Sequence, residues 1–245
     1  MKIVLVTGGT KGIGFECVKR YCQNGHKVIT CSRQEKDWEK MVELYEDLKN
    51  VDYVKCDVSK EDDLNRLFNY INVNYKKLDI AINNASPKIQ SLGKLKDVPI
   101  NSLRSTLESD FWSYVLCIKH ELGLMGFGSS IVNVSSVNGL RPNPGGAMYG
   151  SAKHGIEALT KSVALEAVES GIKINAVAPG VTWTERWETR KEENPNIKLE
   201  VEPLIPIKRF ASVSEIVDAI EWLNSDQSSY VIGHTLVVDG GLSLK

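Results

Sequence analysis

The stretch Ile3-Val4-Leu5-Val6-Thr7-Gly8-Gly9-Thr10-Lys11-Gly12-Ile13-Gly14 decides the fold of this chain. Its first four residues form the apolar run of a buried strand, and an amphipathic helix is predicted to follow over Ile13 to Asn24. The glycines permit a tight turn and a close approach of backbone to a pyrophosphate, while the helix N-terminus offers N–H groups to an anion. Because a strand precedes the turn and a helix follows it, the pattern indicates more than an ordinary glycine turn. It predicts a dinucleotide site made by Gly8, Thr10, Lys11, Gly12, Ile13 and Gly14.

Short apolar runs recur along the chain with amphipathic segments between them. This alternation indicates a doubly wound α/β fold of the Rossmann type, with a parallel seven-stranded sheet and helices on both faces. The predicted strands are Ile3 to Val6, Val28 to Cys31, Tyr53 to Cys56, Ile80 to Asn83, Ile131 to Val134, Ile174 to Ala178 and Leu236 to Val238. The other predicted helices are Trp38 to Leu48, Leu64 to Val73, Leu103 to Leu122, Tyr149 to Glu169 and Val213 to Leu223. A single domain over residues 1–245 accommodates all of them.

Residues 185–210 fit no element well. The segment is rich in mixed charge, contains Pro195, Pro203 and Pro206, and follows the carboxyl end of the sixth predicted strand. Ligands bind at the carboxyl ends of strands in open α/β sheets, so a mobile substrate-binding lid is one interpretation. A disordered surface loop is the other.

Composition and charge argue against several classes of function. The formal net charge is -1 and no block of lysine and arginine occurs, so no nucleic-acid partner is expected. The N-terminus passes from Lys2 into four apolar residues, too few for a signal peptide or a membrane span, which predicts a cytoplasmic protein without a membrane partner. The five cysteines contain neither a C-x-x-C pair nor a His-paired spacing, which predicts reduced, buried thiols and no metal site.

The end of the second predicted strand bears on the choice of dinucleotide. A carboxylate there would bind the ribose 2′-hydroxyl of NAD, whereas a basic group would accept a 2′-phosphate. The strand ends in Ser32-Arg33 without an acid, and Lys11 adds a second cation nearby. A guanidinium binds phosphate bidentately, so NADP(H) is preferred over NAD(H). The alternatives are that both cations are solvated surface charges and that Glu35 serves an NAD ribose.

A serine and a Y-x-x-x-K pattern make up the candidate catalytic set. Ser136 follows the fifth predicted strand, and Tyr149 and Lys153 lie four residues apart in the next helix, hence on one face. A phenol is a poor base at pH 7, but a cation about 4 Å away, at an effective dielectric of ~20, lowers its pKa by up to ~3 units. Tyr149 is therefore the candidate acid/base, with Lys153 as its tuning cation and Ser136 as a donor to the substrate oxygen. Taken singly, the three are also compatible with a helix-start aromatic, a surface lysine and a loop hydroxyl.

With these motifs the chain resembles the short-chain dehydrogenase/reductase family in its single-domain form. The resemblance extends to Cys56-Asp57-Val58, Asn83-Asn84-Ala85, Asn175 to Gly180 with Thr184, and Val238 to Gly241. It implies that Asp57 and Val58 border the adenine and that Asn84 and Ala85 line the cofactor path. It also implies that the nicotinamide and its carboxamide are held by Pro179, Gly180, Val181 and Thr184, and that Lys153, next to Tyr149, hydrogen-bonds the nicotinamide ribose.

One position departs from the family pattern. The resemblance implies an asparagine that kinks the fourth helix and holds a water leading to the lysine, but the aligned segment is Glu108-Ser109-Asp110-Phe111-Trp112. Asp110 takes that place and is counted with the catalytic residues. If the backbone carbonyl holds the water, the exchange is tolerated. If the side chain matters, a carboxylate near Lys153 favours the ammonium and opposes its effect on Tyr149, which moves the pH optimum upward.

The interpretation that follows is an oxidoreductase that transfers a hydride between NADP(H) and a carbonyl or alcohol substrate. Within the family the chain most resembles the 3-oxoacyl-[acyl-carrier-protein] reductases, which implies a homo-oligomer, a tetramer or a dimer. Four aromatic residues near the expected pocket suggest an apolar wall: Phe111, Trp112, Trp183 and Trp187. For the first two, packing in the core is the alternative. The alternatives are an NAD-linked alcohol or sugar dehydrogenase and a non-catalytic NADP(H)-binding regulatory protein that kept the fold.

Overall fold

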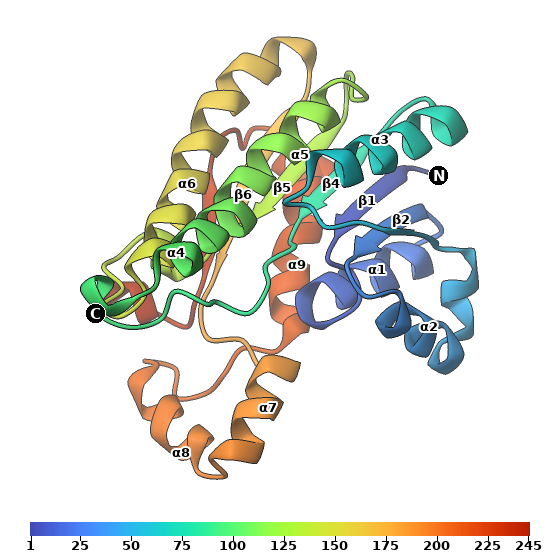
Figure 1. The fold of residues 1–245 in the computed structure, drawn as a ribbon. Coiled ribbons are helices and arrows are strands. Elements are labelled where there is room, and N and C mark those ends of the chain that lie inside the picture. The colour runs from blue at the N-terminus through green and yellow to red at the C-terminus, as the bar shows by residue number, and fades with distance from the viewer.

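The computed structural model describes all 245 residues. They form one domain around a seven-stranded parallel sheet with the strand order β3-β2-β1-β4-β5-β6-β7 (Figure 1). The strands are β1 (Ile3–Thr7), β2 (Lys27–Ser32), β3 (Asp52–Lys55), β4 (Ile80–Asn83), β5 (Ser130–Val134), β6 (Lys173–Pro179) and β7 (Thr235–Val238). All seven predicted strands are confirmed, each within one residue at either end.

Helices cover both faces of the sheet, as the alternating pattern predicts. They are α1 (Gly12–Gln23), α2 (Glu35–Leu44), α3 (Glu61–Tyr75), α4 (Ile100–Leu107), α5 (Ser113–Leu122), α6 (Ala147–Ala167), α7 (Glu185–Glu193), α8 (Ile197–Val201) and α9 (Val213–Asn224). Side chains of β1 alternate between two core layers: Ile3 and Leu5 pack with α3, α5 and α6, whereas Val4 and Val6 pack with α1, α2 and α9. None of these helices combines the length and the apolar character needed to cross a bilayer.

Two predicted helices are interrupted. The helix predicted over Trp38 to Leu48 ends at Leu44, because Tyr45 adopts an extended backbone and packs on Phe15, and a 3₁₀ turn then brings Leu48 into the core. The helix predicted over Leu103 to Leu122 consists of α4, a π-helical turn over Glu108–Trp112, and α5. A π turn carries one extra residue and is frequent at functional sites.

The segment 185–210 forms α7, α8 and a 3₁₀ turn over Glu202–Leu204, so the alternative of a disordered loop is wrong. In Figure 1, α7 and α8 lie outside the layered body of the domain, near the lower end of α9. Trp183 and Trp187 pack edge-on against Phe210, with ring centroids 4.8 and 5.0 Å apart. This aromatic cluster ties the beginning of the segment to its end.

Candidate active site

The glycine turn between β1 and α1 has the close packing that a dinucleotide site requires. A Cβ at Gly9 would lie 2.1 Å from Thr30 Oγ1, and a Cβ at Gly14 would lie 2.3 Å from the carbonyl oxygen of Gly8. Larger residues at these positions would therefore push the turn away from the sheet. Because α1 begins at Gly12, the N–H groups of its first turn lack helical partners and are available to a phosphate. The predicted turn residues Gly8, Thr10, Lys11, Gly12, Ile13 and Gly14 are thus brought together in one turn, the cradle, at the N-terminus of α1.

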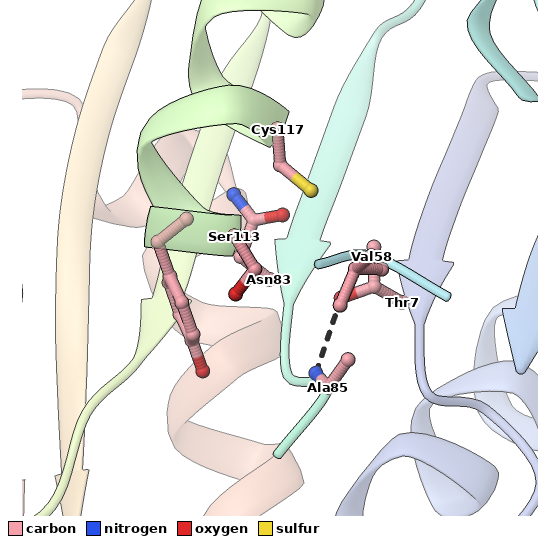
Figure 2. A pocket seen from close by; sticks show the side chains of 7 residues that line it. Thr7, Val58, Asn83, Ala85, Ser113 and Cys117 are labelled. Atoms are coloured by element: carbon pink, nitrogen blue, oxygen red, sulfur yellow. Dashed lines mark hydrogen bonds between the residues drawn. The ribbon is translucent and has the colours of Figure 1, made fainter. Parts of the chain in front are cut away.

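The segment after β4 is fastened to this turn. Thr7 Oγ1 accepts hydrogen bonds from the backbone N–H groups of Asn84 and Ala85 at 3.0 and 3.1 Å, and Asn84 Nδ2 donates to Thr7 O at 3.1 Å. Figure 2 shows the bond between Ala85 and Thr7 at the edge of a small pocket, with Val58 beside it and Ser113 of α5 opposite. Val58, expected to border the adenine, and Ala85, expected along the cofactor path, therefore line one hollow where the strand order reverses.

The side chains expected at the adenosine end of the cofactor differ in whether they already have a protein partner. Arg33 is exposed and engages in no ion pair or side-chain hydrogen bond, whereas Lys11 Nζ is paired with Asp37 Oδ2 at 2.7 Å. The Ser32 hydroxyl lies 3.0 Å from Tyr53 Oη. Asp57 Oδ1 accepts hydrogen bonds from the backbone and hydroxyl of Ser59, which shapes the turn after β3. Of the two cations predicted to attract a 2′-phosphate, only Arg33 is without an acidic partner.

The predicted nicotinamide-binding residues follow the carboxyl end of β6. Pro179 is the last residue of β6, Gly180 donates its N–H to Val238 O, and Thr184 precedes α7 as its N-cap. The side chain of Thr184 lies 3.3 Å from the position of a Cβ built on Gly12. The segment Pro179, Gly180, Val181 and Thr184 therefore reaches back to the glycine turn and closes the cradle from the other side.

The predicted catalytic set also assembles at the carboxyl edge of the sheet. Ser136 follows β5, and Tyr149 and Lys153 lie one turn apart near the start of α6. Tyr149 and Ser136 are each 9% exposed, whereas Lys153 is only 1% exposed. Lys153 Nζ lies 5.6 Å from the centroid of the Tyr149 ring. The helical spacing therefore places the phenol and the amine side by side, as predicted.

Lys153 is held by groups other than Tyr149. Its Nζ donates hydrogen bonds to Tyr114 Oη and to the carbonyl oxygen of Val134, both at 3.2 Å, and lies 3.8 Å from Asp110 Oδ1. Tyr114 Oη itself donates to the same carbonyl at 2.9 Å. All of these side chains are buried, so water does not screen the attraction between Asp110 and Lys153 as it would at the surface.

The titration of this cluster corrects one expectation from the sequence. Burial, and after it the Asp110 carboxylate, raises the pKa of Tyr149 to about 12, while Ser136 and Arg186 oppose the increase. Burial also lowers the pKa of Lys153 to about 8, against the influence of Asp110, which raises it. In the chain alone, loss of solvation therefore outweighs the effect of the neighbouring ammonium on the phenol.

Asp110 occupies the π turn between α4 and α5 and is 1% exposed. Its Oδ1 accepts a hydrogen bond from Ser86 Oγ at 2.5 Å and its Oδ2 one from Ser109 Oγ at 3.1 Å. The side chain, and not only the backbone, thus faces Lys153. Asp110 raises the pKa of both Lys153 and Tyr149. Aspartate in place of the family's asparagine was expected to matter if its side chain acts on Lys153, and this is the case here.

Three residues of this neighbourhood were missed from the sequence: Tyr114, Ser86 and Arg186. Tyr114 lies four residues after Asp110, so the spacing rule that paired Tyr149 with Lys153 was a usable signal. Ser86 directly follows Ala85. Arg186 donates from its Nη2 to the carbonyl oxygens of Ser86 and Pro87, about one hundred residues away, and no local pattern indicates such a contact.

A glycine turn on a parallel sheet, with a buried Ser/Tyr/Lys set at the same edge, defines the class of nucleotide-dependent oxidoreductases. A family model described as enoyl-(acyl carrier protein) reductase matches residues 8–243. The A-factor type gamma-butyrolactone 1′-reductase (1S-forming) of Streptomyces virginiae is 32% identical over 99% of this chain and 96% of that protein. The 3beta-hydroxysteroid dehydrogenase 1 of Eggerthella lenta is 33% identical over 99% and 94%.

Among solved structures, that of ElxO with NADP bound superposes with a TM-score of 0.92 at 29% identity and covers 100% of both chains. The chain therefore belongs to the short-chain dehydrogenase/reductase family, and it is an enzyme of that family.

Proposed function

We propose that this chain is a carbonyl reductase that transfers a hydride between NADP(H) and a carbonyl or alcohol, with reduction of ketones as its main direction. The observation that carries the proposal is the placement of Tyr149 and Lys153 on one face of α6, beside Ser136 and at the carboxyl edge of the sheet. A nicotinamide bound in the cradle supplies the hydride.

The proton chemistry rests on three side chains. Tyr149 donates its proton to the substrate oxygen, and with a pKa of about 12 it carries that proton at neutral pH. Ser136 Oγ accepts a hydrogen bond from the N–H of Asn138, and its hydroxyl, which lies beside Tyr149, donates to the same substrate oxygen. Lys153, with a pKa of about 8, is positively charged below that pH and stabilises the phenolate that remains.

A direct test measures NADPH consumption with a panel of ketones for wild type and Tyr149→Phe. We expect the phenylalanine variant to lose about 10²- to 10⁴-fold in rate, the range attributed to a positioned acid/base, while NADPH affinity is retained. Turnover that survives the substitution, or a wild type that binds NADPH without reducing any ketone, would favour a non-catalytic regulatory protein.

The preference for NADP(H) rests on Arg33, which is exposed and free to grip a 2′-phosphate, and on the absence of an acid at the end of β2. The NADP bound to the similar ElxO structure supports it. The pairing of Lys11 with Asp37 weakens the contribution of the second cation. We expect Arg33→Ala to weaken NADPH binding about 10-fold or more and NADH binding little. Equal losses for both cofactors would favour an NAD-linked dehydrogenase.

Substrate and assembly stay at the level of proposals. The resemblance to 3-oxoacyl-[acyl-carrier-protein] reductases points to 3-oxoacyl thioesters. Two relatives are named as a gamma-butyrolactone 1′-reductase and a 3beta-hydroxysteroid dehydrogenase, so the panel should contain all three classes of substrate. Residues 185–210 are proposed to close over the substrate as a lid. If they do, NADPH should slow cleavage of this segment by a protease. The proposed homo-oligomer is tested by light scattering.

A further inference from the structure

Arg186 bridges two sides of the site. It lies in the first turn of α7, and its Nη2 donates hydrogen bonds to the carbonyl oxygens of Ser86 and Pro87 at 3.3 and 3.1 Å. Those two residues directly follow Asn84 and Ala85, which line the expected cofactor path. The guanidinium therefore links the proposed lid to the segment beside the reacting groups.

The positive charge of Arg186 lies close to the catalytic pair. The Ser86 hydroxyl is bonded to Asp110 Oδ1, and Asp110 lies 3.8 Å from Lys153 Nζ. The same charge lowers the pKa of both Tyr149 and Lys153. An ordinary surface arginine, surrounded by water, would not influence two buried groups in this way.

No carboxylate neutralises this cation. Arg186 takes part in no ion pair, and its Nε and Nη1 donate to no protein atom, while the residue as a whole is exposed to solvent. Neighbouring cations are engaged elsewhere: Arg190 lies 4.6 Å over the Trp187 ring, and Lys198 lies 4.0 Å over the Trp183 ring. Arg186 is thus a cation whose Nε and Nη1 donors are unengaged, and contacts through Ser86 and Asp110 link it to Lys153.

We propose that Arg186 determines substrate specificity by binding an anionic group, specifically a carboxylate, on the substrate whose carbonyl is reduced. This inference rests on the proposed function and names the substrate class of the same site. Guanidinium N–H groups form strong, charge-assisted hydrogen bonds with carboxylate oxygens, and the N–H groups of Nε and Nη1 are not used by the protein. The substrates are therefore oxo acids, held with the carboxylate on Arg186 and the carbonyl oxygen toward Tyr149 and Ser136.

Arg186 could bind the pyrophosphate of the cofactor as well as a substrate carboxylate, because both present anionic oxygens. The experiment must therefore distinguish these two ligands. Initial rates are measured with NADPH and matched pairs: 2-, 3- and 4-oxo acids of short chain, each against its methyl ester. Three variants are compared with wild type: Arg186→Gln, Arg186→Lys and the control Arg190→Gln. Arg190 lies on the same helix and stacks on Trp187, so its variant reports on general damage to α7.

We expect wild type to favour at least one acid over its ester. In Arg186→Gln, kcat/KM for that acid should fall about 10- to 100-fold, with the ester, the KM for NADPH and the thermal midpoint unchanged. Arg186→Lys should restore part of the loss, and Arg190→Gln should behave as wild type.

Three results would overturn the inference. Equal losses of kcat/KM for acid and ester in Arg186→Gln would mean that Arg186 only holds α7 in place, and a raised KM for NADPH without a change in acid-to-ester preference would mean that it binds the cofactor phosphate. The third result is a wild type that reduces only neutral ketones. In that third case the proposed function stands, because its own test, the loss of ketone reduction in Tyr149→Phe, is independent of Arg186.

Discussion

Replacing Glu121 with glutamine tests how this fold tolerates a buried acid. Glu121 lies on α5, is fully buried, and accepts one hydrogen bond from Asn83 Nδ2 at 3.0 Å, while its Oε1 has no partner. Burial raises the pKa of this carboxyl from 4.5 to about 8, and the bond from Asn83 offsets only part of the increase. At neutral pH the folded chain therefore holds a proton on Glu121 that the unfolded chain has released.

The sign and size of the effect follow from linkage. A raised carboxyl pKa gives a contribution to stability that is complete below the ordinary pKa of a glutamate and is lost as the pH rises toward about 8. At about 1.4 kcal/mol per pH unit, the interval between the two pKa values corresponds to roughly 5 kcal/mol at most. Glutamine carries no charge and keeps an oxygen for Asn83, so Glu121→Gln removes this pH-dependent loss.

The assay is urea unfolding of wild type and Glu121→Gln at several pH values between 5 and 9, with the variant minus wild-type difference plotted against pH. We expect the difference to increase in favour of glutamine up to about pH 8 and then to level off. Glu166→Gln, an exposed position on α6, is the matched control and should give a difference independent of pH. A flat difference for Glu121→Gln would refute the argument that an unsolvated carboxyl in this core costs stability as it ionises.

Three further predictions concern residues of the candidate active site. Asp110→Asn should move the alkaline limb of the pH–rate profile for reduction about one unit or more to lower pH, because Asp110 raises the pKa of Lys153 and Tyr149; superimposable profiles would contradict this. Tyr114→Phe removes a hydroxyl bonded to Lys153, so steady-state kinetics should show kcat reduced about 10-fold with the KM for NADPH nearly unchanged; a change in KM alone would argue against a positioning role. Gly9→Ala forces a Cβ against Thr30 Oγ1, which should cost about 1–3 kcal/mol in unfolding free energy and abolish NADPH binding by calorimetry; full affinity would remove the turn from the cofactor site.

The elements and their order were predictable because their signals are local. Apolar runs mark strands that are buried on both faces, and the glycine turn marks the first strand-to-helix connection. The spacing of Tyr149 and Lys153 likewise predicts one shared face whatever surrounds the helix. Each of these statements needs only a few neighbouring residues, which is why the seven strands are correct within one residue.

What escaped prediction depends on contacts between distant segments. The pKa of Tyr149 was expected to fall because only Lys153 was considered, yet burial depends on the whole fold and dominates. The family resemblance implied a kink in the fourth helix and a carboxylate near Lys153, but no residue within Glu108–Trp112 indicates a π turn. The bond of Asp110 to Ser86, 24 residues away, was not predicted. Lys153 was expected to act on Tyr149 directly, but its hydrogen bonds go to Tyr114 and Val134.

The carboxylate at position 110 has a chemical logic in the proposed reaction. Reduction of a carbonyl requires a phenol that holds its proton and an ammonium that is charged, both at the same pH. Burial favours the first state and opposes the second, since it raises the pKa of Tyr149 and lowers that of Lys153. Asp110 raises both pKa values, so it restores charge to Lys153 while it keeps Tyr149 protonated. A neutral asparagine at this place would supply neither effect, so aspartate extends to higher pH the range over which Tyr149 keeps its proton and Lys153 keeps its charge.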